Sequence, residues 1–320
     1  MNKDDTPLIT VGITSFNAVD TIQRALDSAI NQKWPRKEII IVDDCSTDST
    51  WDSLQKLSSQ YGIVRIFRNE RNSGVATSRN RIILEAKGEF IAFFDDDDES
   101  NVDRLLLQYQ RIVDYEQYIS TDVLVICHTA RKLFYPSGEV RYEQTMGCNI
   151  GAVAPFGIDV ARRILVGERV KDAYGACPTC SQMARRSVYL DGGMFDTSFR
   201  RSEDTELNIR LAQLGTHFVG LREPLVNQFM TKTSDKSLQD ELHYMLKLID
   251  KHKDIIGDRR RYHFCRNWIK LKYVWLLNEK PKIILLMIKL ILTHPKMVIY
   301  RVLSAMSNIS LNRSFSRFHK

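Results

Sequence analysis

An apolar run that leads directly into four aspartates limits what this 320-residue chain can fold into. Residues 90–94 read as a buried strand, and Asp95, Asp96, Asp97 and Asp98 follow without a break. Carboxylates this close repel one another, so we expect a cation against them. Proteins hold Mg²⁺ with one or two carboxylates and the phosphates of a substrate. The alternative is a solvated acidic turn that favours the start of the next helix.

Strands and helices alternate over the first 100 residues. Apolar runs predict strands at 8–13, 38–42 and 63–67, and helical periodicity predicts helices after Asp20, around 51–57 and over 75–86. This alternation predicts a doubly wound, mostly parallel α/β sheet with helices on both faces. The loops after the first, second and fourth strands should therefore meet at one edge of that sheet.

Convergence of these loops favours a nucleotide ligand. Asp44 could accept a hydrogen bond from a base, while Thr14 and Asn17 could contact the base edge or the ribose. The sequence has neither a glycine-rich dinucleotide fingerprint after the first strand nor a Gly-Lys-Ser/Thr loop, which disfavours dinucleotide oxidoreductases and P-loop NTPases. Each residue alone has an ordinary alternative as a turn or cap residue.

Four segments, 11–17, 41–48, 72–80 and 93–98, resemble the successive signatures of family 2 glycosyltransferases. The resemblance implies the GT-A fold, a nucleotide-sugar donor with UDP favoured, a divalent metal (Mn²⁺ or Mg²⁺) and inversion at the anomeric carbon. It assigns donor binding to Thr14, Phe16, Asn17, Asp43, Asp44, Arg79, Asp95 and Asp96, and metal binding to Asp95, Asp97 and Asp98. Asp96 stands where the family commonly has a small residue, so the choice among the aspartates stays open.

Glu203 and Asp204 begin a predicted helix that ends at Gly215. Inverting transfer needs a base that takes the proton of the acceptor hydroxyl. A helix cap formed by Ser202 with an acidic first turn would give the same letters. Residues 192–196 and 203–207 resemble the acceptor-side motif of the same family, which assigns the base to Asp204 and an acceptor-side position to Glu203. A strand is expected at 123–127, and loops with short elements at 130–175.

The C-terminal part differs in charge. Residues 251–320 hold 16 Lys and Arg against 3 Asp and Glu, whereas residues 1–250 hold 30 against 36, which argues against nucleic-acid binding by the whole protein. Apolar stretches at 283–292 and 297–306 contain Lys289 and Arg301 and fall short of the about 20 residues that span a bilayer. We expect basic amphipathic helices on an anionic membrane surface. The alternative is a helical subdomain or a contact in a homo-oligomer.

Cysteine spacing and the N-terminus bear on the cellular compartment. The six cysteines are irregularly spaced, and Cys177 and Cys180 lack the second pair that a zinc site of this kind needs, so reduced thiols are expected. Residues 1–7 lack the pattern of a secretory signal peptide. These features favour a cytoplasmic location, peripheral on the inner face of the membrane.

The sequence thus predicts a glycosyltransferase domain over 1–234, with donor binding in 8–100 and the acceptor side in 120–230, and a basic helical tail over 235–320. Its expected reaction moves a sugar from a nucleotide-sugar to a hydroxyl of a glycan or lipid-linked acceptor, in surface polysaccharide synthesis. A metal-dependent nucleotidyltransferase and a catalytically inactive nucleotide-binding membrane adaptor are the alternatives. The presence of both Asp97 and Asp204 disfavours the adaptor.

Overall fold

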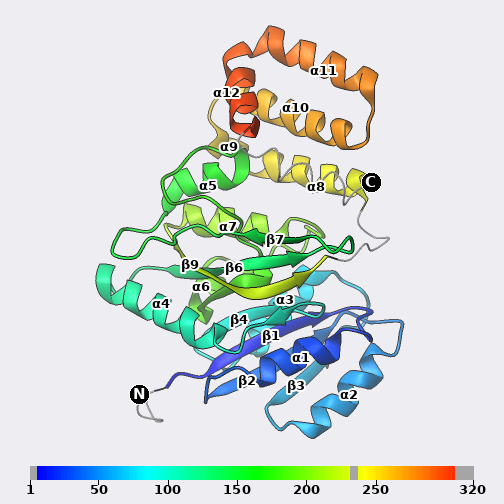
Figure 1. Ribbon diagram of the computed structural model, residues 1–320, viewed down its shortest axis with the longest axis vertical. Helices are drawn as coiled ribbons and strands as arrows, with labels where there is room; N and C mark the ends of the chain where they lie inside the picture. The colour runs from blue at the N-terminus through cyan, green and yellow to red at the C-terminus, as the bar shows by residue number, and fades with distance from the viewer. Residues whose placement is uncertain (1–5, 231–236, 307–320) are drawn as a thin grey trace. The chain divides into compact units, whose positions relative to one another are not determined.

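The computed structural model describes residues 6–230 and 237–306. The chain divides into two compact units, Met1–Thr231 and Lys232–Lys320 (Figure 1). The boundary predicted between residues 234 and 235, and the first five residues of the N-terminal segment, lie outside the described residues.

Unit 1 is built on a nine-stranded sheet with the order β3-β2-β1-β4-β8-β6-β9-β5, in which β7 also pairs with β6. The strands are β1 (Ile9–Ser15), β2 (Lys37–Asp43), β3 (Val64–Arg68), β4 (Phe90–Asp95), β5 (Glu99–Ser100), β6 (Val125–Phe134), β7 (Val140–Glu143), β8 (Gln182–Arg185) and β9 (His217–Phe229). Strands β1 to β4 pair in parallel, as predicted. The remainder is mixed, because β8 runs antiparallel to both β4 and β6.

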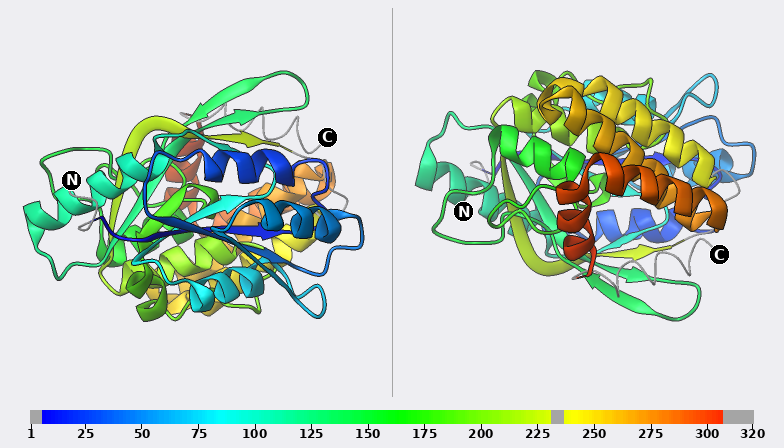
Figure 2. Two further views of the ribbon diagram at one scale, coloured as in Figure 1. Left: turned by 90° about the horizontal axis from the view of Figure 1, so that it is seen from below. Right: turned by 90° about the horizontal axis from the view of Figure 1, so that it is seen from above.

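Helices cover both faces of the sheet, as the strand–helix alternation predicts. Alternate residues of β1 pack into one core with α1 (Ile22–Ile30), α2 (Thr50–Gln60) and α4 (Arg104–Ile119). On the other face lie α3 (Val75–Glu85), α6 (Arg186–Asp191) and α7 (Glu203–Gln213), and α5 (Gly157–Val166) packs against α7. Figure 2, left, shows α1 and α3 on opposite sides of β1.

Helix α3 lies very close to β1, and a glycine makes this approach feasible. A Cβ atom built on Gly12 would lie 2.5 Å from Ile82 Cγ2 of α3. Gly74, at the N-cap position of α3, has φ +90°, a conformation that side-chain-bearing residues rarely adopt. Both glycines thus fix where α3 begins and how closely it approaches the sheet.

Some predictions for unit 1 are wrong. Helix α1 starts at Ile22 with Thr21 at the N-cap position, rather than at a cap formed by Asp20. Strand β6 continues to Phe134, beyond the strand expected at 123–127, and forms a hairpin with β7. Helix α5 also lies in the stretch where loops and short elements were expected. The buried polar residues His128, Thr129 and Arg131 conceal β6 because they break the apolar pattern of a buried strand.

Unit 2 is helical in its described residues. Its helices are α8 (Leu238–Lys251), α9 (Lys253–Ile256), α10 (Arg259–Leu276), α11 (Lys280–Thr293) and α12 (Pro295–Met306). Ser237 caps α8 and Asp258 caps α10, each accepting a hydrogen bond from a backbone N–H of the first turn. Within residues 6–230 and 237–306, no helix alone is long and apolar enough to cross a bilayer; Lys280–Thr293 and Pro295–Leu303 reach that length and composition only together, across a bend of 119°.

Candidate active site

The ends of three neighbouring strands form the floor of the candidate site. In the register of the sheet, Ser15 of β1 lies beside Asp43 of β2, and Thr14 lies beside Asp95 of β4. The sequence-predicted loops therefore do meet at the carboxyl edge of the parallel strands, where open α/β sheets bind ligands.

Asp43 and Asp44 both have protein partners at this edge. The buried Asp43 accepts hydrogen bonds from the backbone and side chain of Ser46, and its Oδ2 pairs with Arg68 Nε at 3.2 Å. Asp44 accepts from the Ser73 and Gly74 N–H groups at 3.0 and 2.7 Å. These carboxylates therefore fix the turn after β2 and the loop that leads into α3. Direct donor contact by either residue stays a prediction.

Phe16 and Asn17 shape the loop after β1. The Phe16 N–H donates to Asp96 Oδ2 at 3.0 Å, and Phe16 is 36% exposed at the edge of the sheet. Asn17 Oδ1 accepts from the Thr47 N–H at 2.8 Å. The Asn17 side chain, which the sequence predicts in the donor site, thus joins the loop after β1 to the loop after β2.

The four aspartates form the tight turn between β4 and β5. Arg24 of α1 donates to the Asp97 carbonyl, and its guanidinium lies 4.1 Å from the centroid of the Phe229 ring. Burial, together with the charge of Asp97, raises the pKa of Asp96 to about 8, although the Phe16 N–H opposes the rise. A turn with this much confined negative charge fits a cationic ligand better than an exposed acidic cap.

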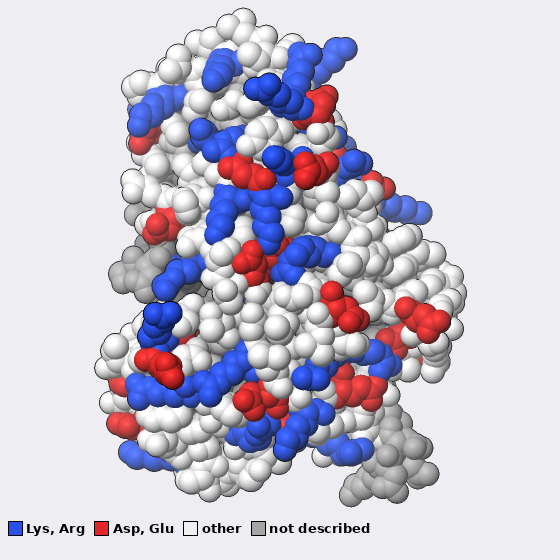
Figure 3. Space-filling model, turned by 180° about the vertical axis from the view of Figure 1, so that it is seen from behind, with Lys and Arg blue, Asp and Glu red and all other residues white. Residues whose placement is uncertain are grey.

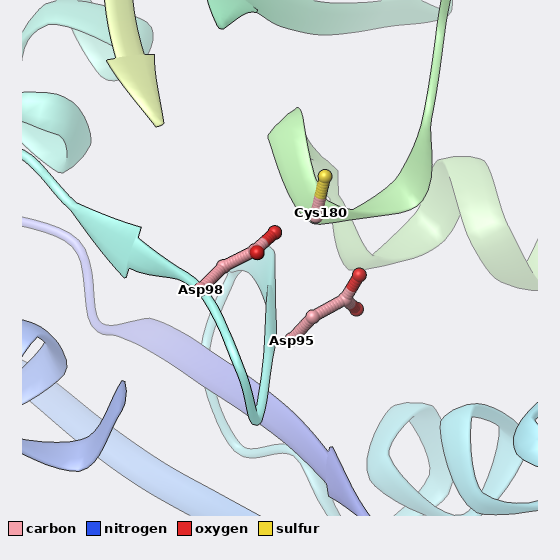
Figure 4. A group of neighbouring side chains, drawn as sticks. All are labelled: Asp95, Asp98 and Cys180. Atoms are coloured by element: carbon pink, nitrogen blue, oxygen red, sulfur yellow. The ribbon is translucent and has the colours of Figure 1, made fainter. Parts of the chain in front are cut away.

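Asp98 carries the observation that fits a metal ion. Its Oδ1 accepts from the Phe229 N–H at 3.1 Å, whereas its buried Oδ2 has no hydrogen-bond partner among the described residues. One ligand atom each of Asp95, Asp98 and Cys180 lies within 4.8 Å of the others. Figure 4 shows the two carboxylates near Cys180, with that of Asp98 extending toward it. A buried carboxylate oxygen without a partner suits a divalent cation. Asp97 is not part of this group, and its metal role stays a prediction.

Cys180 is a site residue that sequence reasoning missed. It lies in the short 3-10 helix η2 (Thr179–Ser181), directly before β8, and β8 pairs antiparallel with β4. This pairing delivers the cysteine to the aspartates, and it has no local sequence signal. Cys177, the other member of the spaced pair, is outside the group of metal-binding atoms.

Arg79 connects the aspartate turn to helix α7. Its side chain is buried and pairs with Glu203 Oε1 at 2.6 Å and with Asp95 Oδ1 at 3.3 Å. Burial raises the pKa of Glu203 to about 7, against the opposing charge of Arg79. The predicted donor residue Arg79 therefore lies between Asp95 and Glu203, with its own side chain buried.

Asp204 lies in the first turn of α7, beside the Arg79–Glu203 pair. The alternative of simple capping requires Ser202 to accept a hydrogen bond from that turn. Instead, Ser202 has φ +60° and makes no capping hydrogen bond, and the Thr205 N–H donates to Asp204 Oδ1 at 2.6 Å. Asp204 thus accepts a hydrogen bond within the first turn, is half-buried and lies close to the charges of the site.

Comparisons with known proteins are consistent with this geometry. A model of glycosyl transferase family 2 matches residues 10–187. A protein named as a teichuronic acid biosynthesis glycosyltransferase, TuaG of Bacillus subtilis, is 40% identical over 104 residues, 32% of this chain and 41% of the relative. UDP-Glc:alpha-D-GlcNAc-diphosphoundecaprenol beta-1,3-glucosyltransferase WfaP of Escherichia coli is 41% identical over 91 residues, 28% of this chain and 36% of the relative. The match thus spans less than half the length of either relative.

Among solved structures, S. aureus TarS 1-349 in complex with UDP-GlcNAc has a similar fold. The TM-score is 0.57 at 18% sequence identity, and the alignment covers 91% of this chain and 82% of that one. At this identity the likeness concerns the fold.

Proposed function

Because the chain belongs to glycosyl transferase family 2, we propose that it is an inverting enzyme that moves a sugar from a UDP-sugar to a hydroxyl of a glycan or lipid-linked acceptor in surface polysaccharide synthesis. The observation that carries this proposal is the buried Arg79 bridge, which joins Asp95 of the aspartate turn to Glu203 beside Asp204. The names of TuaG and WfaP support the substrate class.

The donor nucleotide would lie over the loops after β1 and β2. Phe16 offers an exposed ring for stacking, and Thr14 lies at the strand end beside Asp95. We assign Asn17, Asp43 and Asp44 to holding these loops in place, since their side chains accept hydrogen bonds from neighbouring loop residues. Preformed loops reduce the entropy that is lost on binding.

The donor diphosphate would lie against the aspartate turn. We propose that Asp95, Asp97 and Asp98 hold a divalent metal there, and the unpartnered Asp98 Oδ2 supports this assignment. When bound, such an ion neutralises charge on a leaving diphosphate. Asp96 would hold the loop after β1 through its bond from the Phe16 N–H.

Asp204 would act as the base. Its carboxylate takes the proton of the acceptor hydroxyl while the oxygen attacks the anomeric carbon on the face opposite the leaving nucleoside diphosphate, which inverts the configuration. Glu203 and Arg79 would position Asp204, because their ion pair fixes the start of α7 relative to Asp95.

Unit 2 would bind an anionic membrane surface on the cytoplasmic side. Side chains of α11 at positions i, i+1, i+4, i+7 and i+8 form an apolar stripe whose members are 49–78% exposed: Ile284, Leu285, Ile288, Ile291 and Leu292. Residues 280–306 contain five Lys and Arg and no Asp or Glu. An exposed apolar stripe within a basic segment fits the apolar and anionic layers of a bilayer surface.

Assay of purified protein against UDP-, GDP-, CDP- and dTDP-sugars with Mn²⁺ tests the reaction. We expect a thermal shift with UDP-sugars, because a ligand that binds the folded state raises apparent stability. Turnover with a suitable acceptor should release UDP. Release of pyrophosphate instead would identify nucleotidyl transfer and overturn the proposal, as would the absence of any nucleotide-sugar shift.

A further inference from the structure

Cys180 lies where a third protein ligand would be expected beside two carboxylates. Its side chain is 2% exposed, and its sulfur belongs to the group that holds one oxygen each of Asp95 and Asp98 within 4.8 Å. Cys180 comes from η2, Asp95 from the end of β4 and Asp98 from the turn that follows (Figure 4). Only two segments of the chain therefore supply the three ligand atoms. They lie side by side because β4 and β8 are hydrogen-bonded neighbours.

In each of the two carboxylates, one oxygen has a described protein partner. Arg79 binds Asp95 Oδ1, and the Phe229 N–H binds Asp98 Oδ1. Asp98 is 4% exposed, and its second oxygen lacks a partner among the residues that the structure describes. An unpaired buried carboxylate oxygen is costly, so its presence in a residue of this group points to a ligand there.

Charge around the sulfur is compatible with a cation. Arg131 Nη1 lies 3.8 Å from Cys180 Sγ, and this guanidinium is ion-paired with Glu143. Arg79 is likewise neutralised, through Glu203 and Asp95. Buried Arg104 also acts on Cys180 and Asp95, and its described hydrogen bonds go to neutral groups. One guanidinium without a described carboxylate partner therefore faces the two carboxylates Asp95 and Asp98, which leaves net negative charge for a cation.

We propose that Cys180 Sγ is a ligand of the divalent ion, together with one oxygen each of Asp95 and Asp98. This rests on the metal dependence of the proposed function and adds a sulfur to its ligand set. The thiol proton is released to solvent as the sulfur binds, because the thiolate is the form that ligates. Sulfur ligation favours Co²⁺, Zn²⁺ and especially Cd²⁺ relative to Mg²⁺, which prefers oxygen.

Titration of the full chain with Co²⁺ alone and with Cd²⁺ alone tests this ligand set. Sulfur bound to Co²⁺ gives a charge-transfer absorption in the near ultraviolet, which oxygen ligands do not give. We expect this band in the unsubstituted chain and in Cys177→Ser, a matched control three residues away, and its loss in Cys180→Ser. Losing a residue that only hydrogen-bonds to a metal ligand costs about 10–100-fold in metal affinity. Losing the sulfur ligand itself should therefore lower the Cd²⁺ affinity of Cys180→Ser by at least that range, while the Mg²⁺ affinity changes little.

Bound Co²⁺ without the band, or a band that persists in Cys180→Ser, would overturn the proposal. Should Cys180→Ser fail to fold, the NMR shift of bound cadmium in the unsubstituted chain decides, and a shift typical of oxygen ligands alone counts against the sulfur. The outcome is separate from that of the enzymatic assay. Glycosyl transfer without the cobalt band overturns only the sulfur ligand, and the band without any transfer leaves the ligand set standing while the proposed reaction falls.

Discussion

At the scale of single residues, aspartates that look alike in the sequence differ in their partners. Asp43 uses both oxygens inside its turn, whereas Asp98 keeps one buried oxygen without a described partner. Both aspartates follow apolar strands, so the sequence alone places both at the ligand site and cannot tell their roles apart. Side-chain hydrogen bonds decide which aspartates build the loops and which remain able to bind a cation.

Substitution Asp204→Asn separates catalysis from helix stability. Removing a general base costs about 10²–10⁴-fold in rate, whereas removing a helix-terminal contact costs about 1 kcal/mol of stability. We expect turnover to be lost by that factor while calorimetry shows unchanged UDP-sugar affinity. Near-normal turnover in Asp204→Asn would return this residue to a structural role.

Asp97→Asn tests whether binding of the UDP-sugar depends on a metal ion at the aspartate turn. A diphosphate beside the aspartate turn meets like charge at short range unless a cation intervenes. We expect UDP-sugar affinity to depend on Mn²⁺ in the parent chain, and that dependence to disappear in Asp97→Asn and not in the exposed control Asp191→Asn. Isothermal titration with Mn²⁺ or with EDTA measures this; equal affinity of the parent chain in both conditions would contradict it.

His128 predicts how stability depends on pH. It is fully buried on β6, its ring is stacked on Phe218, and burial lowers its pKa from 6.5 to about 3. The unfolded chain therefore binds a proton below about pH 6.5 that the folded chain does not, so stability is lost as pH falls from 6.5 toward 3.

His128→Phe removes this proton and keeps a ring against Phe218. Relative to the variant, the parent chain should lose about 1.4 kcal/mol of unfolding free energy per pH unit below pH 6. Urea unfolding between pH 5 and 7 provides the measurement. His243→Phe is the control, because His243 is exposed and should leave the parental slope unchanged; identical slopes in all three chains would refute the assignment.

At the scale of elements, the sequence predicted those whose pattern is local. Strands β1 to β4 and helix α3 follow from continuous apolar runs, helical spacing and Gly74. Strand β6 was underestimated because its buried polar residues have partners on other elements, such as Arg131 with Glu143 of β7. Cys180 and Arg24 reach the site only through packing, since one depends on the β4–β8 pairing and the other on where α1 lies.

The close packing of α3 on β1 can be tested at Gly12. A Cβ there would lie 2.5 Å from Ile82 Cγ2, a buried β-branched side chain with little freedom to move. Overpacking of this kind costs about 1–3 kcal/mol, so Gly12→Ala should lower the free energy of unfolding by that amount. Gly62→Ala is the control, because its Cβ would meet nothing within 4 Å; equal stability of the two variants would show that α3 can retreat without cost.

At the scale of the whole molecule, unit 2 differs from unit 1 in its excess of basic residues and in the exposed apolar stripe of α11. The basic residues concentrate after residue 250, a feature visible in the sequence. The part of Figure 3 that shows unit 2 has Lys and Arg side chains, with some Asp and Glu, among uncharged surface. The sequence could not show which faces of α11 stay exposed, because both are apolar: Leu290 is buried, whereas Leu292, two positions further, is 78% exposed.

The apolar stripe of α11 should therefore attach the protein to anionic vesicles. Burying one such side chain contributes about 1.5–3 kcal/mol, and each Lys or Arg near an anionic surface about 1 kcal/mol. Leu285→Asp combined with Leu292→Asp should thus weaken vesicle binding by at least about a hundredfold, since about 1.4 kcal/mol corresponds to tenfold. Lys282→Gln combined with Lys289→Gln should weaken it less, and only on anionic lipid at low salt.

Flotation of the full chain with neutral and anionic vesicles, at low and high salt, measures both effects. Ile150→Asp controls for loss of exposed apolar area, because Ile150 is 86% exposed on unit 1. The contrary outcome has two parts: the parent chain does not bind anionic vesicles at low salt, and it sediments as a dimer that the two leucine substitutions dissociate. In that case a second copy of this chain covers the apolar stripe. The outcome bears on the proposed function: a membrane-bound unit 2 would keep the protein at the surface where the proposed lipid-linked acceptors would lie, whereas a dimer contact would leave binding of the acceptor to unit 1 alone.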